Sequence, residues 1–381
     1  MKDMNSMRNE IAQIDNELIY LVSERMRKCG ELAEYKQENG IALHDNQHMQ
    51  EKLKDIMENT DESMRSYVYM MYSFLFDISR SYEQGLINPS TALMNKITKA
   101  IEDTDKVFPP YAVVACQGVE GAFSQHACEK IFDIPNIMYF NHFEGVFSAI
   151  DKGLCKYGVL PVENSTAGSV NAIYDLMMKY RFCIVRSVRL KVDHSLLVKP
   201  GTKLEDIKEI FSHEQAIGQC SDYIRDLKDV KVTLCENTAS AAKLVAESER
   251  TDIAAIASRD CAQLYGLQLL GEAIQNTDNN YTRFICISKK LEIYAGADRT
   301  SIMMTIGHKP GTLYKVLSRF YALGINLVKL ESRPLPDRDF EFMFYFDLET
   351  SVYSPRFAQL ICELDEMSEK FSYLGSYLEI M

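Results

Sequence analysis

The chain has 381 residues, of which 46% are hydrophobic and 25% charged, an ordinary composition for folded soluble domains with room for two or three of them. Its formal net charge of −12 argues against broad nucleic-acid binding, which needs a basic surface. A small anionic ligand would need a few local cations to hold it against this overall field.

Cysteine and histidine spacing gives little support for a metal site. The ten cysteines form no C-x-x-C pair, and His44 and His48, though spaced four apart, lack the glutamate of a zinc-protease helix and an obvious third ligand. Free thiols fit a reducing cytoplasm. The N-terminus is too polar for a signal peptide, and no apolar run approaches the roughly 18 residues of a membrane span. We therefore expect a cytoplasmic protein without a membrane partner.

Residues 1–88 are predicted to be all helical. Apolar residues recur at helical spacing over about residues 4–37, which predicts one helix roughly 50 Å long, and further helices are expected over 45–58 and 62–84. The first helix is too long to be covered by a small monomer, so we expect a homodimer or a higher homo-oligomer. Residues 89–110 are predicted to be a linker.

Two cations lie on the apolar stripe of the first predicted helix. Arg25 follows Leu21 by four residues, and Lys36 follows Arg25 by eleven, about three full turns. Ser79 and Glu83 form a polar pair on the third predicted helix. Because a buried cation is costly unless an anion meets it, this set predicts a pocket for a small anionic ligand. The alternative is that the long side chains reach solvent and form ordinary ion pairs.

This pattern resembles the all-helical chorismate mutase family, whose first helix carries two arginines and a lysine among apolar residues at the same spacing. In that family the cations hold the two carboxylates and the ether oxygen of the substrate, and one first-helix arginine comes from the partner subunit. The reaction is a pericyclic rearrangement, so positioning and electrostatics suffice without a nucleophile. The resemblance implies that chorismate is bound by Arg8, Arg25, Lys36, Asp45, Ser79 and Glu83.

Three residues depart from that family. His48 and Met49 stand where it usually has an Arg-Glu pair, and Glu83 replaces a glutamine. A glutamic acid there can donate to the ether oxygen only when protonated, which favours activity at lower pH. The alternative is that residues 1–88 are only a degenerate dimerisation module.

From residue 111 to residue 289, short apolar runs alternate with helical segments, which predicts an α/β domain. A long mid-region crossing and a late return strand indicate two lobes with a cleft. Polar clusters lie at predicted strand ends, where α/β sheets bind ligands, and single residues in them are equally explained as helix caps. These clusters are GVEGAFS at 118–124, PVENSTAGSV at 161–170, SHEQAIGQC at 212–220 and NYTRF at 280–284.

Together and in this order, the clusters resemble the prephenate dehydratase family, which implies a two-lobed fold like that of periplasmic binding proteins, with the active site in the cleft. Thr282 is then the hydrogen-bond donor to the departing ring hydroxyl, a safer description than general acid for a weakly acidic threonine. Arg283 either binds a substrate carboxylate or makes a structural contact within the protein, and the two interpretations have equal weight. The resemblance also implies that the cleft is lined by Glu163, Asn164, Ser165, Thr166, Ser212, His213, Gln215 and Gln219.

Residues 299–381 predict the order β-α-β-β-α-β of a ferredoxin-like α+β domain. Pro310–Leu313 and Glu331–Pro334 resemble the ligand-binding segments of an ACT domain attached to these dehydratases, and a helix opened by glycine can receive a carboxylate. Thr312 replaces the usual alanine, and the alternative is a structural dimerisation lobe. The resemblance implies that phenylalanine binds as an effector at Gly311, Thr312, Leu313, Glu331, Ser332, Arg333 and Pro334.

The three resemblances together imply a bifunctional enzyme that rearranges chorismate to prephenate and then converts prephenate to phenylpyruvate. We expect no metal or organic cofactor and feedback by phenylalanine. One alternative is arogenate as the substrate, which differs from prephenate by an amino group. Another is a non-catalytic amino-acid-sensing protein, although Thr282 and an intact PVENST argue against it, because binding alone needs no leaving-group donor.

Overall fold

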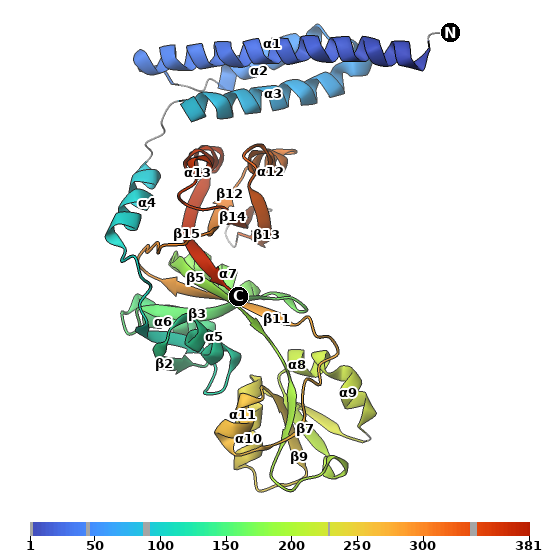
Figure 1. Cartoon of the computed structure of the whole chain (residues 1–381), viewed down its shortest axis with the longest axis vertical. Helices are drawn as coiled ribbons and strands as arrows, with labels where there is room; N and C mark the ends of the chain where they lie inside the picture. The colour runs from blue at the N-terminus through green and yellow to red at the C-terminus, as the bar shows by residue number, and fades with distance from the viewer. Residues whose placement is uncertain (1–2, 43–45, 87–91, 228, 336–340) are drawn as a thin grey trace. The chain divides into compact units, whose positions relative to one another are not determined.

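A computed structural model describes residues 3–42, 46–86, 92–227, 229–335 and 341–381 (Figure 1). The chain divides into two compact units. The first comprises Met1–Lys96, Ile306–Asn326 and Tyr353–Glu369, and the second comprises Ile97–Thr305, Leu327–Val352 and Lys370–Met381. No helix within the described residues is both long enough and apolar enough to cross a membrane.

The first unit is helical. Its N-terminal part has α3 packed against both α1 and α2, and the C-terminal helix α13 also contacts α3. The predicted helix over 4–37 is α1, which ends one residue later. The helical elements of this unit are α1 (Met4–Glu38), α2 (Asn46–Glu58), η1 (Glu62–Met64), α3 (Arg65–Leu86), α12 (Thr312–Ala322) and α13 (Pro355–Met367).

A buried cation ties the later helices of this unit to α3. Arg319 on α12 is 3% exposed and donates to the backbone oxygen of Asp77 on α3 at 2.6 Å. Its guanidinium also lies 3.4 Å from a carboxylate oxygen of Glu363 on α13. Ser81 on α3 donates to the same carboxylate at 2.6 Å. The three helices are therefore joined by polar contacts in the interior of the unit.

The described residues of the second unit form two sheets. The larger has the strand order β13-β14-β12-β15-β5-β11-β3-β1-β2, with β4 paired to β3. Its strands are β1 (Tyr111–Gln117), β2 (Ile134–Phe140), β3 (Tyr157–Asn164), β4 (Gly168–Ser169), β5 (Cys183–Lys191), β11 (Tyr281–Ser288), β12 (Arg299–Thr305), β13 (Asn326–Pro334), β14 (Phe342–Glu349) and β15 (Lys370–Ile380).

The smaller sheet has the order β10-β6-β9-β7-β8. Its strands are β6 (Ser195–Val198), β7 (Glu209–Ser212), β8 (Lys231–Leu234), β9 (Ile253–Ala257) and β10 (Gln268–Gly271). The chain enters this sheet after β5 and returns after β10 to form β11, so two connections join two lobes. This arrangement agrees with the predicted crossing and late return strand. Each lobe has its own apolar core.

Helices cover both lobes and reflect local sequence signals. The apolar run IAAIA of β9 is buried throughout, and the alanine-rich α10 packs against it. α10 begins where the side chain of Asn237 accepts a hydrogen bond from the amide of Ser240, a typical N-cap. Helix α4 (Ala92–Asp103) begins in the first unit and ends in the second. The other helical elements of the second unit are α5 (Phe123–Ile131), α6 (Phe143–Asp151), α7 (Asn171–Tyr180), η2 (Leu204–Asp206), α8 (Glu214–Gln219), α9 (Ser221–Asp226), α10 (Thr238–Glu247) and α11 (Asp260–Tyr265).

The C-terminal elements follow the predicted order β-α-β-β-α-β along the chain, from β12 to β15. One feature was not expected: the end of β15, Leu378–Ile380, pairs in parallel with Arg186–Val188 of β5. The strands β12–β15 therefore continue the sheet that carries β11 and β3. The two compact units do not follow the domain boundaries expected at residues 88, 110, 289 and 299. Those boundaries remain a prediction.

Candidate active sites

A cavity of about 580 Å³ lies within the second unit. Residues from the larger sheet, including Asn164 and Thr282, line it together with residues from the smaller lobe, including His213, Gln219 and Thr238. The sequence analysis expected Thr282 in a cleft between two lobes, and in the structure Thr282 lines this cavity. The cavity is large enough for a molecule the size of a substituted six-membered ring.

Thr282 and Asn164 form a directional hydrogen bond in this cavity. The Asn164 Nδ2 lies 2.8 Å from the Thr282 Oγ1, and the same nitrogen donates to the Asn280 Oδ1 at 2.8 Å. The Asn164 Oδ1 accepts from the backbone amides of Thr166 and Ala167, at 3.0 and 2.9 Å. These amides fix the orientation of the Asn164 side chain. Thr282 therefore accepts from Asn164, which leaves its own hydroxyl proton to point at a ligand.

Gln219 connects this pair to the smaller lobe. Its Nε2 donates to the Thr166 Oγ1 at 2.6 Å, and its Oε1 accepts from the Asn280 Nδ2 at 2.9 Å. The same oxygen lies 2.8 Å from the His194 Nε2. Polar side chains from β3, β11 and α8 are thus held in one network around the cavity.

Three helices of nine or ten residues begin at the cavity wall. Phe123 and Ser124 open α5, Asn171 opens α7, and Thr238 opens α10. Free backbone N–H groups and the positive end of the helix dipole make such termini favourable for anions. Before α5, Gly121 has a φ of +86°, and a Cβ there would lie 2.9 Å from the Cys261 Sγ. The GVEGAFS turn therefore needs glycine at this position.

The cavity is poor in charged side chains. The described lining residues include no lysine or arginine, and Glu236 is their single carboxylate. Burial lowers the pKa of both His194 and His213, so that both imidazoles are neutral at neutral pH. Backbone dipoles, and not side-chain cations, are the groups available to an anionic ligand here.

The expected cleft residues divide into two groups. Asn164, His213, Gln215, Gln219 and Thr282 line the cavity. The other five are outside the described lining: Glu163, Ser165, Thr166, Ser212 and Arg283.

Each of these five has a contact that explains its place. Ser212 is fully buried, and its hydroxyl donates to the backbone oxygen of Ile256. Ser165 donates to the backbone oxygen of Asn279 and accepts from the amide of Tyr281, which ties the β3 turn to the start of β11. Thr166 supports Asn164 and Gln219, as described above. Glu163 and Arg283 face the other side of the sheet.

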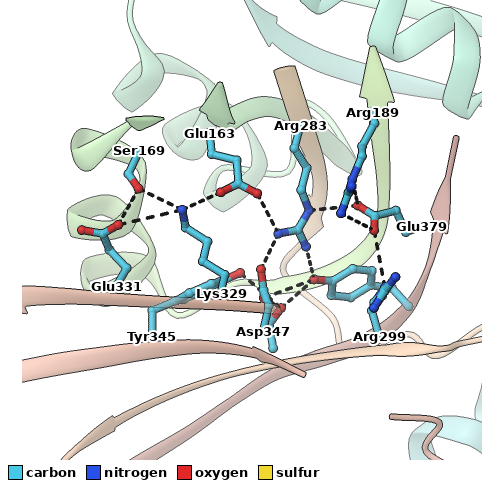
Figure 2. A network of polar contacts seen from close by, with 12 residues as sticks. Glu163, Ser169, Arg189, Arg283, Arg299, Lys329, Glu331, Tyr345, Asp347 and Glu379 are labelled. Carbon is cyan, nitrogen blue, oxygen red and sulfur yellow. Dashed lines mark hydrogen bonds and ion pairs between the residues drawn. The ribbon is translucent and has the colours of Figure 1, made fainter. Parts of the chain in front are cut away.

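Glu163 and Arg283 belong to a buried ion network with the C-terminal strands (Figure 2). Arg283 is 3% exposed and pairs with Asp347 of β14 and with Glu379 of β15. The sequence analysis gave equal weight to a substrate carboxylate and a structural contact for Arg283. Its carboxylate partners are in the protein itself, which favours the structural contact.

A second cavity, of about 290 Å³, lies in the helical unit. Four of the expected chorismate ligands line it: Arg25, Lys36, Ser79 and Glu83. Arg25 donates through Nη1 to the Ser79 Oγ, and its guanidinium carbon lies 5.2 Å from the centre of the Phe76 ring. Burial is the main cause that raises the pKa of Glu83.

Two expected ligands are not among the described residues that line this cavity. Arg8 is exposed and precedes Arg25 by seventeen residues on α1, which is about 26 Å along the helix axis. It cannot reach the cavity of its own chain. Asp45 lies outside the described residues. The sequence analysis missed Lys52 and Arg80, which also line the cavity. Lys52 follows His48 by one helical turn, and this spacing could have indicated it.

The expected phenylalanine ligands fall in two segments. Gly311 caps α12 with a φ of +85°, and the hydroxyl of Thr312, which precedes Leu313, donates to the backbone oxygens of Gly307 and Lys309. In the second unit, the end of β13 carries Glu331, Ser332, Arg333 and Pro334. There Glu331 accepts from Ser169, and Arg333 forms a bidentate pair with Asp175 of α7.

The residues that line each cavity lie within a segment that matches a known family. Residues 114–292 match the family model "Prephenate dehydratase", and residues 7–84 match "Chorismate mutase type II". A bifunctional chorismate mutase/prephenate dehydratase of Aquifex aeolicus is 30% identical over 99% of this chain and 98% of its own length. Arogenate dehydratase/prephenate dehydratase 2 of Arabidopsis thaliana is 33% identical over 79% of this chain and 80% of its own length.

A solved structure, prephenate dehydratase from Arthrobacter aurescens in complex with L-Phe, superposes with a TM-score of 0.64. It is 27% identical and covers 70% of this chain and 89% of its own. The fold and cavities therefore define a two-lobed α/β dehydratase preceded by a helical mutase domain. The chain belongs to the family of bifunctional chorismate mutase/prephenate dehydratases, which confirms the resemblances to chorismate mutase and to prephenate dehydratase found in the sequence.

Proposed function

We propose that this chain rearranges chorismate to prephenate in the helical unit and converts prephenate to phenylpyruvate in the larger cavity. The observation that carries the second step is the hydrogen bond from Asn164 to Thr282. Because the threonine oxygen accepts from Asn164, its proton is directed to a bound ligand. Neither step requires a metal or an organic cofactor.

The dehydratase step needs help mainly at the leaving hydroxyl. As the bond between the ring and its carboxylate breaks, carbon dioxide is released, the electron pair moves into the ring and the hydroxyl opposite departs as hydroxide, which takes up a proton from solvent to give water. Aromatisation supplies the driving force. The Thr282 hydroxyl stabilises the developing hydroxide by hydrogen bonding, and Asn164 holds it in that orientation.

The absence of lysine and arginine from the described lining suits this chemistry. A cation bound to the departing carboxylate would stabilise the ground state more than the transition state, because the negative charge leaves that group during the reaction. The N-termini of α5, α7 and α10 supply weaker, neutral donors for the substrate acids.

Arogenate is the second candidate substrate, and Glu236 favours it. As the one carboxylate of the described lining, it can accept a hydrogen bond from the ammonium group that arogenate carries in place of the keto group of prephenate. Several relatives are named arogenate dehydratases, including arogenate dehydratase 1 of Petunia hybrida, which is 38% identical over 69% of this chain. Kinetics with both substrates, for the wild type and Glu236→Gln, separate the two.

For the mutase step, Arg25 and Lys36 hold the carboxylates of chorismate, and protonated Glu83 donates to its ether oxygen. Arg8 serves the same site from a second copy of the chain, since it cannot reach its own. The protein is then a homodimer or a higher homo-oligomer in the cytoplasm. The residues of β13 and of the α12 N-terminus belong to an ACT-type domain that binds phenylalanine as a feedback effector.

Replacement of Thr282 by valine tests the dehydratase assignment, because valine keeps the shape and removes the hydroxyl. We expect the rate of phenylpyruvate formation from prephenate to fall by about 100-fold or more, as for the loss of one transition-state hydrogen-bond donor. Thr282→Ser keeps the donor and should keep most of the rate.

The mutase rate of the same preparation is the control for folding. A Thr282→Val protein with the full dehydratase rate would remove Thr282 from the mechanism. A folded wild type that binds prephenate without turnover would favour the sensing protein.

A further inference from the structure

The two strands that present Thr282 and Asn164 each carry a charged residue beside the cavity residue. In the antiparallel pairing of β11 with β3, Thr282 is opposite Asn164 and Arg283 is opposite Glu163. Successive side chains of a strand point to opposite faces of the sheet. The pair Thr282–Asn164 therefore faces the cavity, and the neighbouring pair Arg283–Glu163 faces away from it.

Arg283 is bound on this second face by the C-terminal strands. It donates to the carboxylate of Asp347 on β14 and, through Nη2, to the Tyr377 hydroxyl on β15 at 2.8 Å. Its Nε lies 3.2 Å from a carboxylate oxygen of Glu379 on β15. Figure 2 shows the Arg283 guanidinium directed at Asp347 and Glu379 from above the C-terminal strands.

Glu163 links Arg283 to a third C-terminal strand. Its Oε1 lies 3.5 Å from the Arg283 Nη1, and its Oε2 accepts from the Lys329 Nζ of β13 at 2.5 Å. Lys329 also donates to the Ser169 Oγ at 2.9 Å, and Ser169 lines the cavity. The carboxylate of Glu163 thus joins β13 to β11 beside the cavity.

The ion network pairs four cations with five carboxylates. Its cations are Arg189, Arg283, Arg299 and Lys329, and its anions are Glu163, Glu331, Asp347, Glu349 and Glu379. Asp347 is fully buried, and the side chain of Glu379 is 2% exposed. A buried charge that loses its partner is strongly disfavoured, so these side chains stay together when the strands shift.

We propose that Glu163, Arg283 and Lys329 are positioning residues, which fix the Thr282–Asn164 pair and make the dehydratase rate depend on the placement of β13–β15. The proposal rests on the proposed dehydratase function, and it names the contacts through which the C-terminal strands regulate that site. A shift of β13 moves Lys329, and Lys329 moves Glu163 through their ion pair. Because Asn164 follows Glu163 on β3, the shift also reaches Asn164. A displacement of this kind changes the orientation of the hydroxyl that faces the leaving group.

Lys329→Met is the test variant, because it removes the charge on β13 and leaves the buried Arg283 paired. We expect kcat for prephenate to fall by about tenfold with KM within about twofold of wild type, since the variant disturbs alignment and not substrate binding. The mutase rate of the same chain stays at the wild-type value. Lys329→Arg, which keeps the cation, recovers most of kcat.

Lys179→Met is the matched control. Lys179 on α7 also pairs with a glutamate, Glu144 on α6, across two elements of the same unit, but this pair is exposed and lies on helices and not on the strands that carry Thr282 and Asn164. The kcat of the Lys179→Met protein stays at the wild-type value, even if its unfolding temperature drops as much as that of Lys329→Met. A merely structural role for Lys329 would lower the unfolding temperature without lowering kcat in the folded protein.

The outcomes separate the two proposals. An active wild type with an equally active Lys329→Met protein overturns the positioning role and leaves the dehydratase function intact. A rise in KM alone also overturns it, because Lys329 would then act on substrate binding. A folded wild type that does not turn over prephenate or arogenate overturns the dehydratase function and this proposal with it.

Discussion

At the scale of single residues, the role proposed for Glu83 predicts the pH dependence of the mutase step. Desolvation raises its pKa, and Cys29, Lys36, Arg25 and Arg80 oppose this shift. A raised pKa means that the protonated, donating form persists to higher pH than for a free glutamic acid. The mutase rate is therefore highest below this pKa and falls as the pH rises through it.

Glu83→Gln is the corresponding test. Glutamine donates at every pH, so the variant should hold its mutase rate where the wild type loses it. Mutase rates of both proteins across acidic and neutral pH check this, with the dehydratase rate at each pH as a control for folding. A wild-type rate that increases with pH, or a Glu83→Gln profile that follows the wild type, would contradict the assignment.

The dehydratase residues show how far a motif can predict a site. The resemblance gave Thr282, Asn164, His213, Gln215 and Gln219, and the structure brings them to one cavity. The resemblance assigned all the polar residues of PVENST to the cleft, but adjacent residues of a strand point to opposite faces of the sheet. Glu163 therefore faces away from the cavity while Asn164 faces it. Only the pairing of β3 with β11 decides which of the two does so.

At the scale of elements, Arg319 shows a role that the sequence did not reveal. The pattern of α12 predicts a helix with one apolar face, and nothing local indicates that an arginine in it is buried. Its partners, Asp77 and Glu363, come from α3 and α13, far away in the chain. The same limit applies to the pairing of β15 with β5, because long-range partners depend on packing and not on local sequence.

Replacing Arg319 by methionine should destabilise the helical unit. The change leaves Glu363, which is 3% exposed, without its cation, and breaking a buried pair in this way costs about 3–5 kcal/mol. Denaturant unfolding followed by the helical signal measures the loss. Lys315→Met on the same helix is the control, because Lys315 is half-exposed and 3.9 Å from Asp77, and it should change stability by less than about 1 kcal/mol. Equal stabilities of the two variants would show that the Arg319 contacts contribute little.

At the scale of the whole molecule, the exposed apolar face of α1 predicts that two copies of the chain pack together. Met4, Ile11, Ile14, Leu18 and Leu21 on α1 are each at least 44% exposed. Such an apolar stripe is typical of a helix that packs against another chain. The same helix carries Arg8, which lies too far from the cavity of its own chain. A second copy that packs along α1 would cover the stripe and bring Arg8 to the site.

Mixing two inactive variants tests this exchange of Arg8. Arg8→Ala and Arg25→Ala homodimers each lack one ligand at every site, so we expect both to lose most mutase activity. In a mixed dimer, one site keeps both arginines and the other loses both. Random reassociation makes half of the dimers mixed, so the mixture should recover about a quarter of the wild-type mutase rate.

A mixture of Arg25→Ala with Lys36→Ala is the matched control. Arg25 and Lys36 line the same cavity of one chain, so no site in that mixture has both, and its mutase rate should stay at the level of the separate variants. The dehydratase rate should be unchanged throughout, because none of these residues is in the second unit. Recovery in the control mixture, or none with Arg8→Ala, would mean that Arg8 does not complete the site of a partner.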